Sequence, residues 1–279
     1  MKQSLTEKII LGIVFVIFTA YAISLVFPFA WALINSFKTS VEFFNIDNVW
    51  KLPSKWMVSN YVNVLSEYEI GKMFLRSIYV TVAGTGLAVM MSATTAYVVS
   101  KYEFKLRNLI YITAVTVMVI PTVGSLSATF KLVNNLGLYN NLWLFPIIYA
   151  GGFGFGFLLL YAYFKGISWT YAEAAFVDGA TDFDVFFKIM IPQAKPALVA
   201  LGIIQGINVW NDFFAPFMFI PEKKTLAVGL QDLVNIMQYR AEWPKMFAAM
   251  IISALPIIIV FVIFQKTIME NTVAGGLKG

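Results

Sequence analysis

One segment of the sequence concentrates charged, hydrogen-bonding and helix-capping residues, and it lies between positions 168 and 196 (SWTYAEAAFVDGATDFDVFFKIMIPQAKP). The chain has no Cys and no His, so it lacks thiol nucleophiles, the usual general base and the commonest metal ligand. It also lacks the GxxxxGK[ST] pattern of a P-loop that would hold ATP phosphates. We therefore expect no catalysis, metal or bound cofactor.

The pattern of this segment predicts two short helices joined by a tight turn. Thr170 and Glu173 have the spacing of a capping box, which predicts that the first helix begins there. Gly179 is expected to end that helix in the left-handed backbone conformation, which costs any residue with a Cβ. Thr181 and Asp184 predict the cap of the second helix.

The second helix is predicted to carry an apolar face. Phe183, Phe186, Phe187 and Met190 have the spacing i, i+3, i+4 and i+7, which places them on one side of a helix. Pro192 is expected to stop this helix. Such a face fills a socket on a partner protein or rests on the lipid surface.

The elements that must hold this segment are apolar enough to cross a membrane. The chain is 59% hydrophobic and 13% charged, with a mean hydropathy of +0.77, whereas soluble domains are about a quarter charged. Its basic residues lie at the ends of apolar runs, as membrane-flanking Lys and Arg do, which argues against nucleic-acid binding. The runs without Asp, Glu, Lys or Arg are residues 9–37, 77–100, 108–130, 132–164 and 246–265.

Crossing the hydrocarbon core takes roughly 20 apolar residues, so these runs predict an all-α integral membrane protein with about six transmembrane helices. The first apolar run is too long for the core of a signal peptide and is expected to be retained. The predicted spans are 9–37, with a kink at Pro28, and about 74–99, 108–130, 140–164, 196–220 and 246–265.

The other sequence features complete the expected organisation. The glycines at 151, 152, 154 and 156 predict that the fourth span packs closely against a neighbouring backbone. Residues 1–279 are expected to form one transmembrane domain, with the two-helix loop at 168–196 and loops on the opposite side at about 38–73 and 221–245. Six spans would place equal numbers of Lys and Arg on the two sides of the membrane. The basic loop at 101–107 favours the cytoplasm for the side on which it lies.

The spacing within 168–196 resembles the EAA motif of ABC importer permeases, EAA-x3-G-x9-I-x-L-P. The sole departure is Ile191, where the family usually has Leu. The resemblance implies a type I ABC importer fold in which this loop is the coupling helix that docks on a cytoplasmic ATPase subunit. It also implies that both termini are cytoplasmic. The implied coupling residues are Glu173, Ala174, Ala175, Asp178, Gly179, Phe183, Phe186, Phe187, Ile189, Ile191 and Pro192.

Three further segments resemble the maltose-type carbohydrate permeases: residues 210–213 (WNDF), 225–230 (TLAVGL) and 275–279 (GGLKG). The resemblance implies a cell-membrane permease subunit of an ATP-dependent, binding-protein-dependent importer of sugars or oligosaccharides. The implied partners are a homologous second permease, two ABC ATPase subunits that carry ATP and Mg, an extracytoplasmic solute-binding protein and the lipid bilayer.

Asp212 is the one carboxylate within a predicted span, and ionisable groups in a membrane usually face a cavity or a partner. We expect it to line the translocation path with Asn208, Trp210 and Asn211, because amides, carboxylates and aromatic faces hold sugars. Alternatively, Asp212 reaches the outer interface or bonds to the companion subunit.

Two other functions remain open from the sequence. An ABC permease for an amino acid, phosphate or polyamine would carry the same EAA loop. An ATP-independent secondary transporter would need internal inverted repeats and paired intramembrane charges, and the sequence has neither.

Overall fold

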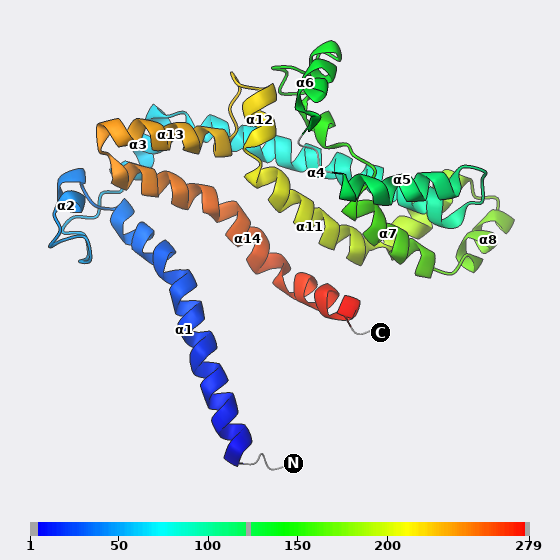
Figure 1. Ribbon diagram of the computed structural model, residues 1–279, viewed down its shortest axis with the longest axis horizontal. Helices are drawn as coiled ribbons and strands as arrows, with labels where there is room; N and C mark the ends of the chain where they lie inside the picture. The colour runs from blue at the N-terminus through cyan, green and yellow to red at the C-terminus, as the bar shows by residue number, and fades with distance from the viewer. Residues whose placement is uncertain (1–4, 121–123, 277–279) are drawn as a thin grey trace. The chain divides into compact units, whose positions relative to one another are not determined.

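The computed structural model describes residues 5–120 and 124–276. These residues form helices, turns and loops without a strand, which confirms the all-α prediction. They divide into two compact units: unit 1 is Met1–Lys72 with Gly229–Leu255, and unit 2 is Met73–Val228 with Pro256–Gly279 (Figure 1). The single transmembrane domain expected over residues 1–279 stays a prediction.

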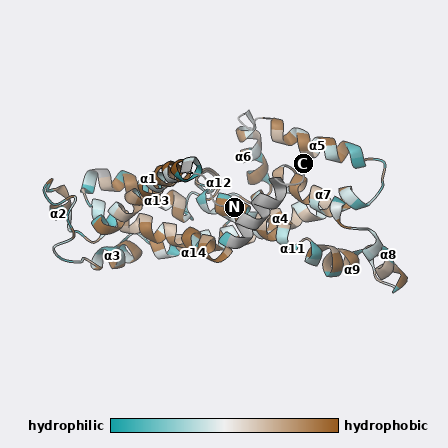
Figure 2. Ribbon diagram, turned by 90° about the horizontal axis from the view of Figure 1, so that it is seen from below, coloured by the Kyte–Doolittle hydropathy of each residue, from teal (hydrophilic) through white to brown (hydrophobic). Residues whose placement is uncertain are grey.

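Three helices of the described part are each long and apolar enough to cross a membrane, and they confirm three of the predicted spans. In Figure 2, α1 is drawn mainly in the brown of hydrophobic residues. Pro28 lies inside α1 and Pro256 inside α14. The three helices are α1 (Leu5–Ser36), α4 (Ile70–Lys101) and α14 (Trp243–Gly276).

The remaining predicted spans are each divided between shorter helices, and the number of membrane crossings stays a prediction. Residues 108–130 are divided between α5 (Arg107–Val119) and α6 (Leu126–Asn135). Ile120 after α5 is extended, with φ −75° and ψ 118°, because a residue before a proline is sterically kept out of the helical region. That proline, Pro121, lies outside the described residues.

The fourth and fifth predicted spans are also interrupted. Residues 140–164 contain a short 3-10 helix, η2 (Phe145–Tyr149), and α7 (Phe155–Gly166). Residues 196–220 contain α11 (Lys195–Asn211) and α12 (Phe214–Phe219). Gly154 has a φ of +88°, so the chain reaches α7 through a conformation that favours glycine.

The two segments predicted as loops on the opposite side contain helices of their own. Segment 38–73 holds α2 (Ser40–Phe44), which Thr39 caps by accepting the Glu42 N–H, and α3 (Ser59–Glu67). Segment 221–245 holds α13 (Leu226–Arg240).

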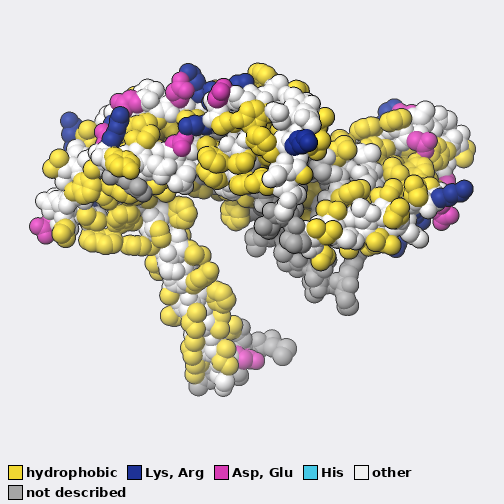
Figure 3. Space-filling view, turned by 45° about the horizontal axis from the view of Figure 1, so that its top comes forward, with side chains coloured by type: hydrophobic (Ala, Val, Ile, Leu, Met, Phe, Trp, Pro, Cys, Tyr) yellow, Lys and Arg dark blue, Asp and Glu magenta, His cyan; other side chains and the backbone are white. Residues whose placement is uncertain are grey.

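Lys38 ties the end of α1 to the loop that follows α2. Its side chain is fully buried, and Nζ donates to the carbonyl oxygens of Asn48 at 2.7 Å and Val49 at 3.1 Å. Burial lowers the pKa of this ammonium, against the raising effect of Glu42. None of the apolar span of α1 is buried against the rest of the protein. Figure 3 shows this helix covered largely by hydrophobic side chains.

The core of unit 2 forms where α4, α7 and the region from 185 to 201 pack together. Gly152 and Gly156 allow the close approach that the glycine-rich sequence predicted. A Cβ on Gly152 would lie 2.7 Å from Thr95 Oγ1, and one on Gly156 would lie 2.9 Å from Ser92 Oγ. Thr95 and Ser92 both belong to α4, so the prediction is confirmed for Gly152 and Gly156. It is wrong for Gly151, where an added Cβ would meet no atom within 4 Å, and for Gly154, where it would meet only Met118 Cγ at 3.9 Å.

Candidate coupling loop and path-lining residues

The segment from 168 to 196 folds as two helical pieces at the end of unit 2, as the sequence predicted. The first piece is α8 (Thr170–Val177), which follows directly after α7 (Figure 1). The second runs without a break through α9 (Asp182–Asp184), the π-helical η3 (Val185–Met190) and α10 (Ile191–Gln193). It then bends by 77° into α11.

The predicted cap of the first helix is wrong, because α8 begins one residue earlier than the capping box requires. Trp169 is the N-cap, its side chain caps nothing, and its carbonyl accepts the Glu173 N–H at 3.1 Å. Ser168 Oγ accepts the Thr170 N–H at 3.3 Å and donates to Thr170 Oγ1 at 3.0 Å. Ser168 thus accepts the Thr170 N–H that the predicted capping box had assigned to the Glu173 side chain.

The predicted cap of the second helix is confirmed. Thr181 Oγ1 accepts the Asp184 N–H at 3.2 Å, and Asp184 Oδ2 accepts the Thr181 N–H at 3.1 Å. Asp184 Oδ1 also lies 2.6 Å from Lys188 Nζ. The hydrogen bond from Lys188, followed by those from Thr181, holds the pKa of the Asp184 carboxyl well below its usual range.

The turn between the two helices depends on Gly179, as predicted. Its φ is +84°. An added Cβ would meet no heavy atom within 4 Å, so the requirement for glycine comes from the backbone conformation and not from crowding.

Pro192 does not stop the second helix, contrary to the sequence prediction. The chain remains helical through Gln193 and breaks at Ala194, whose φ and ψ are −83° and 2°. A proline in a regular helix clashes with the carbonyl four residues earlier. Here the wider i→i+5 turns of η3 come directly before Pro192 and leave it room.

The predicted apolar face is divided between the inside and the outside of the protein. Phe186 and Met190 are buried, whereas Phe183 is 76% exposed and Phe187 is 48% exposed. Consecutive side chains on a helix point about 100° apart, so Phe186 can pack against the protein while Phe187 faces outward. The exposed pair, Phe183 and Phe187, is the part of the face that remains available to a partner.

Glu173 is exposed, and its carboxylate makes no hydrogen bond or ion pair with any described residue. Ala174, Asp178 and Pro192 are also exposed, while Ala175, Ile189 and Ile191 are partly buried. Both helical pieces therefore present exposed residues, and Glu173 adds a free carboxylate. Figure 3 shows charged side chains gathered over the end of unit 2 that carries α8 and α9.

An aromatic network fixes this loop to the end of α4, and the sequence analysis did not find it. Tyr102 donates to Asp182 Oδ1 at 2.6 Å, and its hydroxyl lies 3.1 Å from that of Tyr97. Burial, together with the bond to Asp182, raises the pKa of Tyr102, which keeps the hydroxyl protonated as a donor. The Tyr97 ring packs 4.9 Å from Phe186, and Lys101 Nζ donates to the Ile167 carbonyl. The pair of tyrosines flanking the basic residue Lys101 was the available signal.

The predicted path residues do not share one environment. Asn208 and Asn211 are exposed, and their amides donate to Gln205 Oε1 at 3.3 Å and to the Ile207 carbonyl at 2.9 Å. Gln205, Asn208 and Asn211 are spaced by three residues and form an amide row along α11.

Asp212 forms a contact within its own chain. Its Oδ2 accepts a hydrogen bond from the Tyr149 hydroxyl at 2.8 Å, and its Oδ1 accepts the Ala215 N–H at 3.1 Å. It therefore joins the end of α11 both to η2 and to the first turn of α12. Both carboxylate oxygens are engaged, so Asp212 acts here as a structural link.

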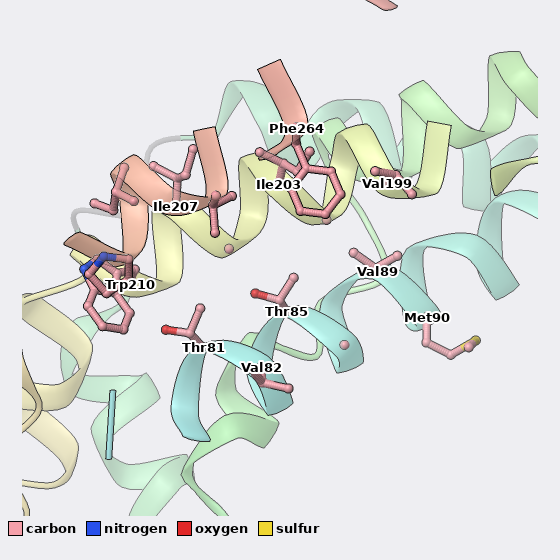
Figure 4. Close-up of a pocket in the computed structure, with 16 residues that line it drawn as sticks. Thr81, Val82, Thr85, Val89, Met90, Val199, Ile203, Ile207, Trp210 and Phe264 are labelled. Atoms are coloured by element: carbon pink, nitrogen blue, oxygen red, sulfur yellow. The ribbon is translucent and has the colours of Figure 1, made fainter. Parts of the chain in front are cut away.

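Trp210 lines a cavity of about 600 Å³ between α4, α11 and α14 (Figure 4). The wall is apolar except for the hydroxyls of Thr81 and Thr85 and the indole of Trp210, and neither hydroxyl has a hydrogen-bond partner. Because so few polar groups face it, this cavity suits apolar groups better than a sugar. Among the described residues, no cluster of His, Cys, Asp and Glu could hold a metal ion.

Comparisons with known proteins agree with this geometry. The chain is 33% identical to the probable ABC transporter permease protein YurM of Bacillus subtilis, over 95% of this chain and 88% of YurM. It is 29% identical to the diacetylchitobiose uptake system permease protein NgcG of Streptomyces coelicolor, over 92% and 86%. Its fold matches a chain of the crystal structure of a bacterial ABC transporter involved in the import of the acidic polysaccharide alginate. That match has a TM-score of 0.83 and 23% identity, and covers 95% of this chain and 99% of the other.

Residues 84–270 match the family described as the binding-protein-dependent transport system inner membrane component. This region contains the whole EAA-like loop and most of unit 2. The match covers more than half of the chain, and the apolar helices agree with a membrane location. The chain therefore belongs to this family of membrane permease components of binding-protein-dependent ABC importers.

Proposed function

We propose that this chain is the permease subunit of an ATP-dependent importer of sugars or oligosaccharides, and that it forms half of the translocation path. The names of its relatives support the substrate class: besides diacetylchitobiose, they include arabinooligosaccharides and starch degradation products. The other half of the path would come from a homologous second permease. An extracytoplasmic binding protein would deliver the sugar.

The coupling loop carries this proposal. The unpaired carboxylate of Glu173 and the exposed rings of Phe183 and Phe187 form a charged and apolar surface suited to a socket on an ATPase subunit. In this assignment the loop and both termini are cytoplasmic, and ATP and Mg are bound by two partner ATPase subunits. This chain itself has no catalytic role.

The loop is built to pass on a displacement as a unit. Tyr102, Tyr97 and Phe186 join it to α4, and the helical piece from 182 to 193 leads directly into α11. A push on the loop by a closing ATPase pair would therefore move α4 and α11 together. Closure must favour the outward-facing state by several kcal/mol to shift the equilibrium almost completely.

The amide row on α11 is the best candidate for sugar contact in this chain. Gln205, Asn208 and Asn211 offer donors and acceptors along one line, and the two asparagines are exposed. An exposed amide is costly against lipid tails, so these side chains suit a water-filled path or a partner helix. Asp212 fixes the C-terminal end of α11 through its hydrogen bonds. Trp210 packs beside that end, against Phe74.

The test of this assignment uses the complete complex reconstituted in vesicles with its binding protein. Glu173→Ala is expected to lose most of the ATPase stimulation by loaded binding protein, while assembly remains intact. Glu222→Ala, an exposed carboxylate outside the loop, is the matched control and should behave as wild type. Full stimulation in Glu173→Ala would remove the coupling role of this residue.

Uptake of labelled oligosaccharides, an amino acid, phosphate and a polyamine by the same vesicles tests the substrate class. Sugar uptake that depends on ATP supports the proposal. Uptake of another solute alone would reassign the substrate, and uptake without ATP would indicate a secondary transporter.

A further inference from the structure

A small polar cavity lies beside the base of the coupling loop, entirely within unit 2. Its volume is about 430 Å³. Three helices contribute to it, each near the end that leads toward the loop or toward the basic turn at 101–107. The lining residues are Val99 of α4, Arg107, Asn108 and Tyr111 of α5, and Tyr161 and Lys165 of α7.

Two cations face this cavity with little negative charge to balance them. Lys165 lies over the Tyr161 ring, with Nζ 5.9 Å from the ring centroid, and forms no ion pair among the described residues. Arg107 donates through Nε to the Val99 carbonyl at 2.8 Å, which fixes the guanidinium against the end of α4. Its nearest carboxylate belongs to Glu103, 3.9 Å away and 93% exposed, so that pair is weak.

Neutral donors complete the lining. The rings of Tyr111 and Tyr161 pack 4.9 Å apart. Neither phenol hydroxyl, nor the side-chain amide of Asn108, is hydrogen-bonded to another residue in the described part of the chain. Val99, which also lines the cavity, belongs to the apolar core of unit 2. Two cations and three free donors around one cavity have the chemistry of a site for a phosphate group.

The position of the cavity favours a phosphate that belongs to a lipid. Arg107 begins α5 and Lys165 lies in the last turn of α7, where membrane-flanking cations meet lipid headgroups. Leu109 and Ile112, on the same helix as Arg107, are each 59% exposed and could contact acyl chains. Basic pockets between helices on the cytoplasmic side are known to take anionic headgroups.

We infer that this cavity binds the phosphate of an anionic phospholipid, held by Lys165 and Arg107. A free phosphate has the same chemistry and is the other possible source. The assignment to the cytoplasmic leaflet rests on the proposed function, which sets the side of the membrane on which the coupling loop lies. A bound phosphate would join α5 to α7 only a few residues before α8, and would thus stiffen the support of the coupling loop.

The first experiment counts bound lipid on the assembled complex. The complex is purified into phosphatidylcholine micelles that contain a minor fraction of phosphatidylglycerol, and native mass spectrometry counts the phosphatidylglycerol retained. Lys165→Gln is expected to retain roughly fivefold less than wild type, because one Lys near the headgroups is worth about that factor. Lys165→Arg should restore retention. Lys105→Gln, an exposed basic residue that does not line the cavity, is the control and should change nothing.

The second experiment separates lipid phosphate from free phosphate. In pure phosphatidylcholine, inorganic phosphate is compared with chloride at equal ionic strength for its effect on thermal unfolding. In one outcome, phosphate raises the unfolding temperature of wild type but not of Lys165→Gln, while both proteins retain the same amount of phosphatidylglycerol. That result would support the site with free phosphate, and not a lipid, as its occupant. Equal behaviour of the two proteins in both experiments would overturn the inference. Neither readout uses transport or ATP hydrolysis, so failure here is distinct from failure of the Glu173 test.

Discussion

The coupling loop and the C-terminal end of α11 differ in the range of the contacts that shape them. In the loop, the turn at Gly179 and the cap between Thr181 and Asp184 involve residues at most five positions apart. At the end of α11, Asp212 depends on Tyr149, which is 63 residues away in the sequence. Local contacts can be read from spacing, whereas distant ones depend on how the helices pack.

Two adjacent rings of the coupling loop, Phe186 and Phe187, differ sharply in burial. Their substitution is expected to give the largest difference in the free energy of unfolding. Phe186 is buried against Tyr97, whereas Phe187 is about half exposed. Phe186→Ala should lower the free energy of unfolding by about 3–5 kcal/mol, as the removal of a buried aromatic ring usually does. Phe187→Ala should cost less than about 1 kcal/mol but reduce ATPase stimulation. Denaturant unfolding of the purified complex measures the first quantity.

A chemical control for the first variant is Phe186→Leu, which keeps most of the apolar volume and should recover much of the lost stability. Equal unfolding free energies for Phe186→Ala and Phe187→Ala would show that the two rings share one environment. The division of the apolar face would then be wrong.

The turn between the two helical pieces gives the second prediction. Gly179→Val places a branched side chain at a φ of +84° in open space, so its whole cost is backbone strain of about 1–2 kcal/mol or more. We expect a loss of transport on the order of tenfold, since the strain would shift the loop away from its docked geometry. Binding-protein-stimulated transport in vesicles measures it.

Gly166→Ala is the matched control for this turn. Gly166 also has open space around a new Cβ, but its φ lies outside the left-handed region. Transport close to wild type is expected in that variant. A similar loss in both variants would mean that the loop tolerates no side chain near its base, whatever the backbone conformation.

The same contrast explains what could be predicted from the sequence. Gly179 and the Thr181–Asp184 cap were found because their chemistry is local, and the three long apolar helices were found because length and composition are sufficient. The Thr170 cap failed because the helix begins one residue earlier, so the Glu173 N–H donates to the Trp169 carbonyl and the Thr170 N–H donates to Ser168. The division between Phe186 and Phe187 was missed because the spacing pattern does not show which of two consecutive rings packs against Tyr97. The contacts of Asp212 and Tyr102 required the packing of distant helices.

The third prediction concerns the distant contact. Asp212→Asn and Tyr149→Phe each remove part of one hydrogen bond to a carboxylate, which is typically worth about 1.5–3 kcal/mol. Because the two residues share this bond, the double variant should lose little more stability than the worse single variant. The KM for sugar should stay close to wild type in both single variants if Asp212 is a structural link. A large rise in KM for Asp212→Asn alone would place the carboxylate in the path instead.

The smallest effect is expected from the pH dependence of the local contact at Asp184. Lys188 and Thr181 hold the pKa of this carboxyl below the ordinary value of 3.8. The folded state therefore binds this proton less readily than the unfolded state, and the contribution to stability is present above about pH 4 and lost as the pH falls below it. Wild type should unfold at a higher temperature than Asp184→Asn at pH 7, with a difference that narrows below about pH 4. Asp178→Asn, an exposed carboxylate at the end of α8, should match wild type throughout. A difference between wild type and Asp184→Asn that persists undiminished into acid would show that the charge on Asp184 is not what holds the second helix.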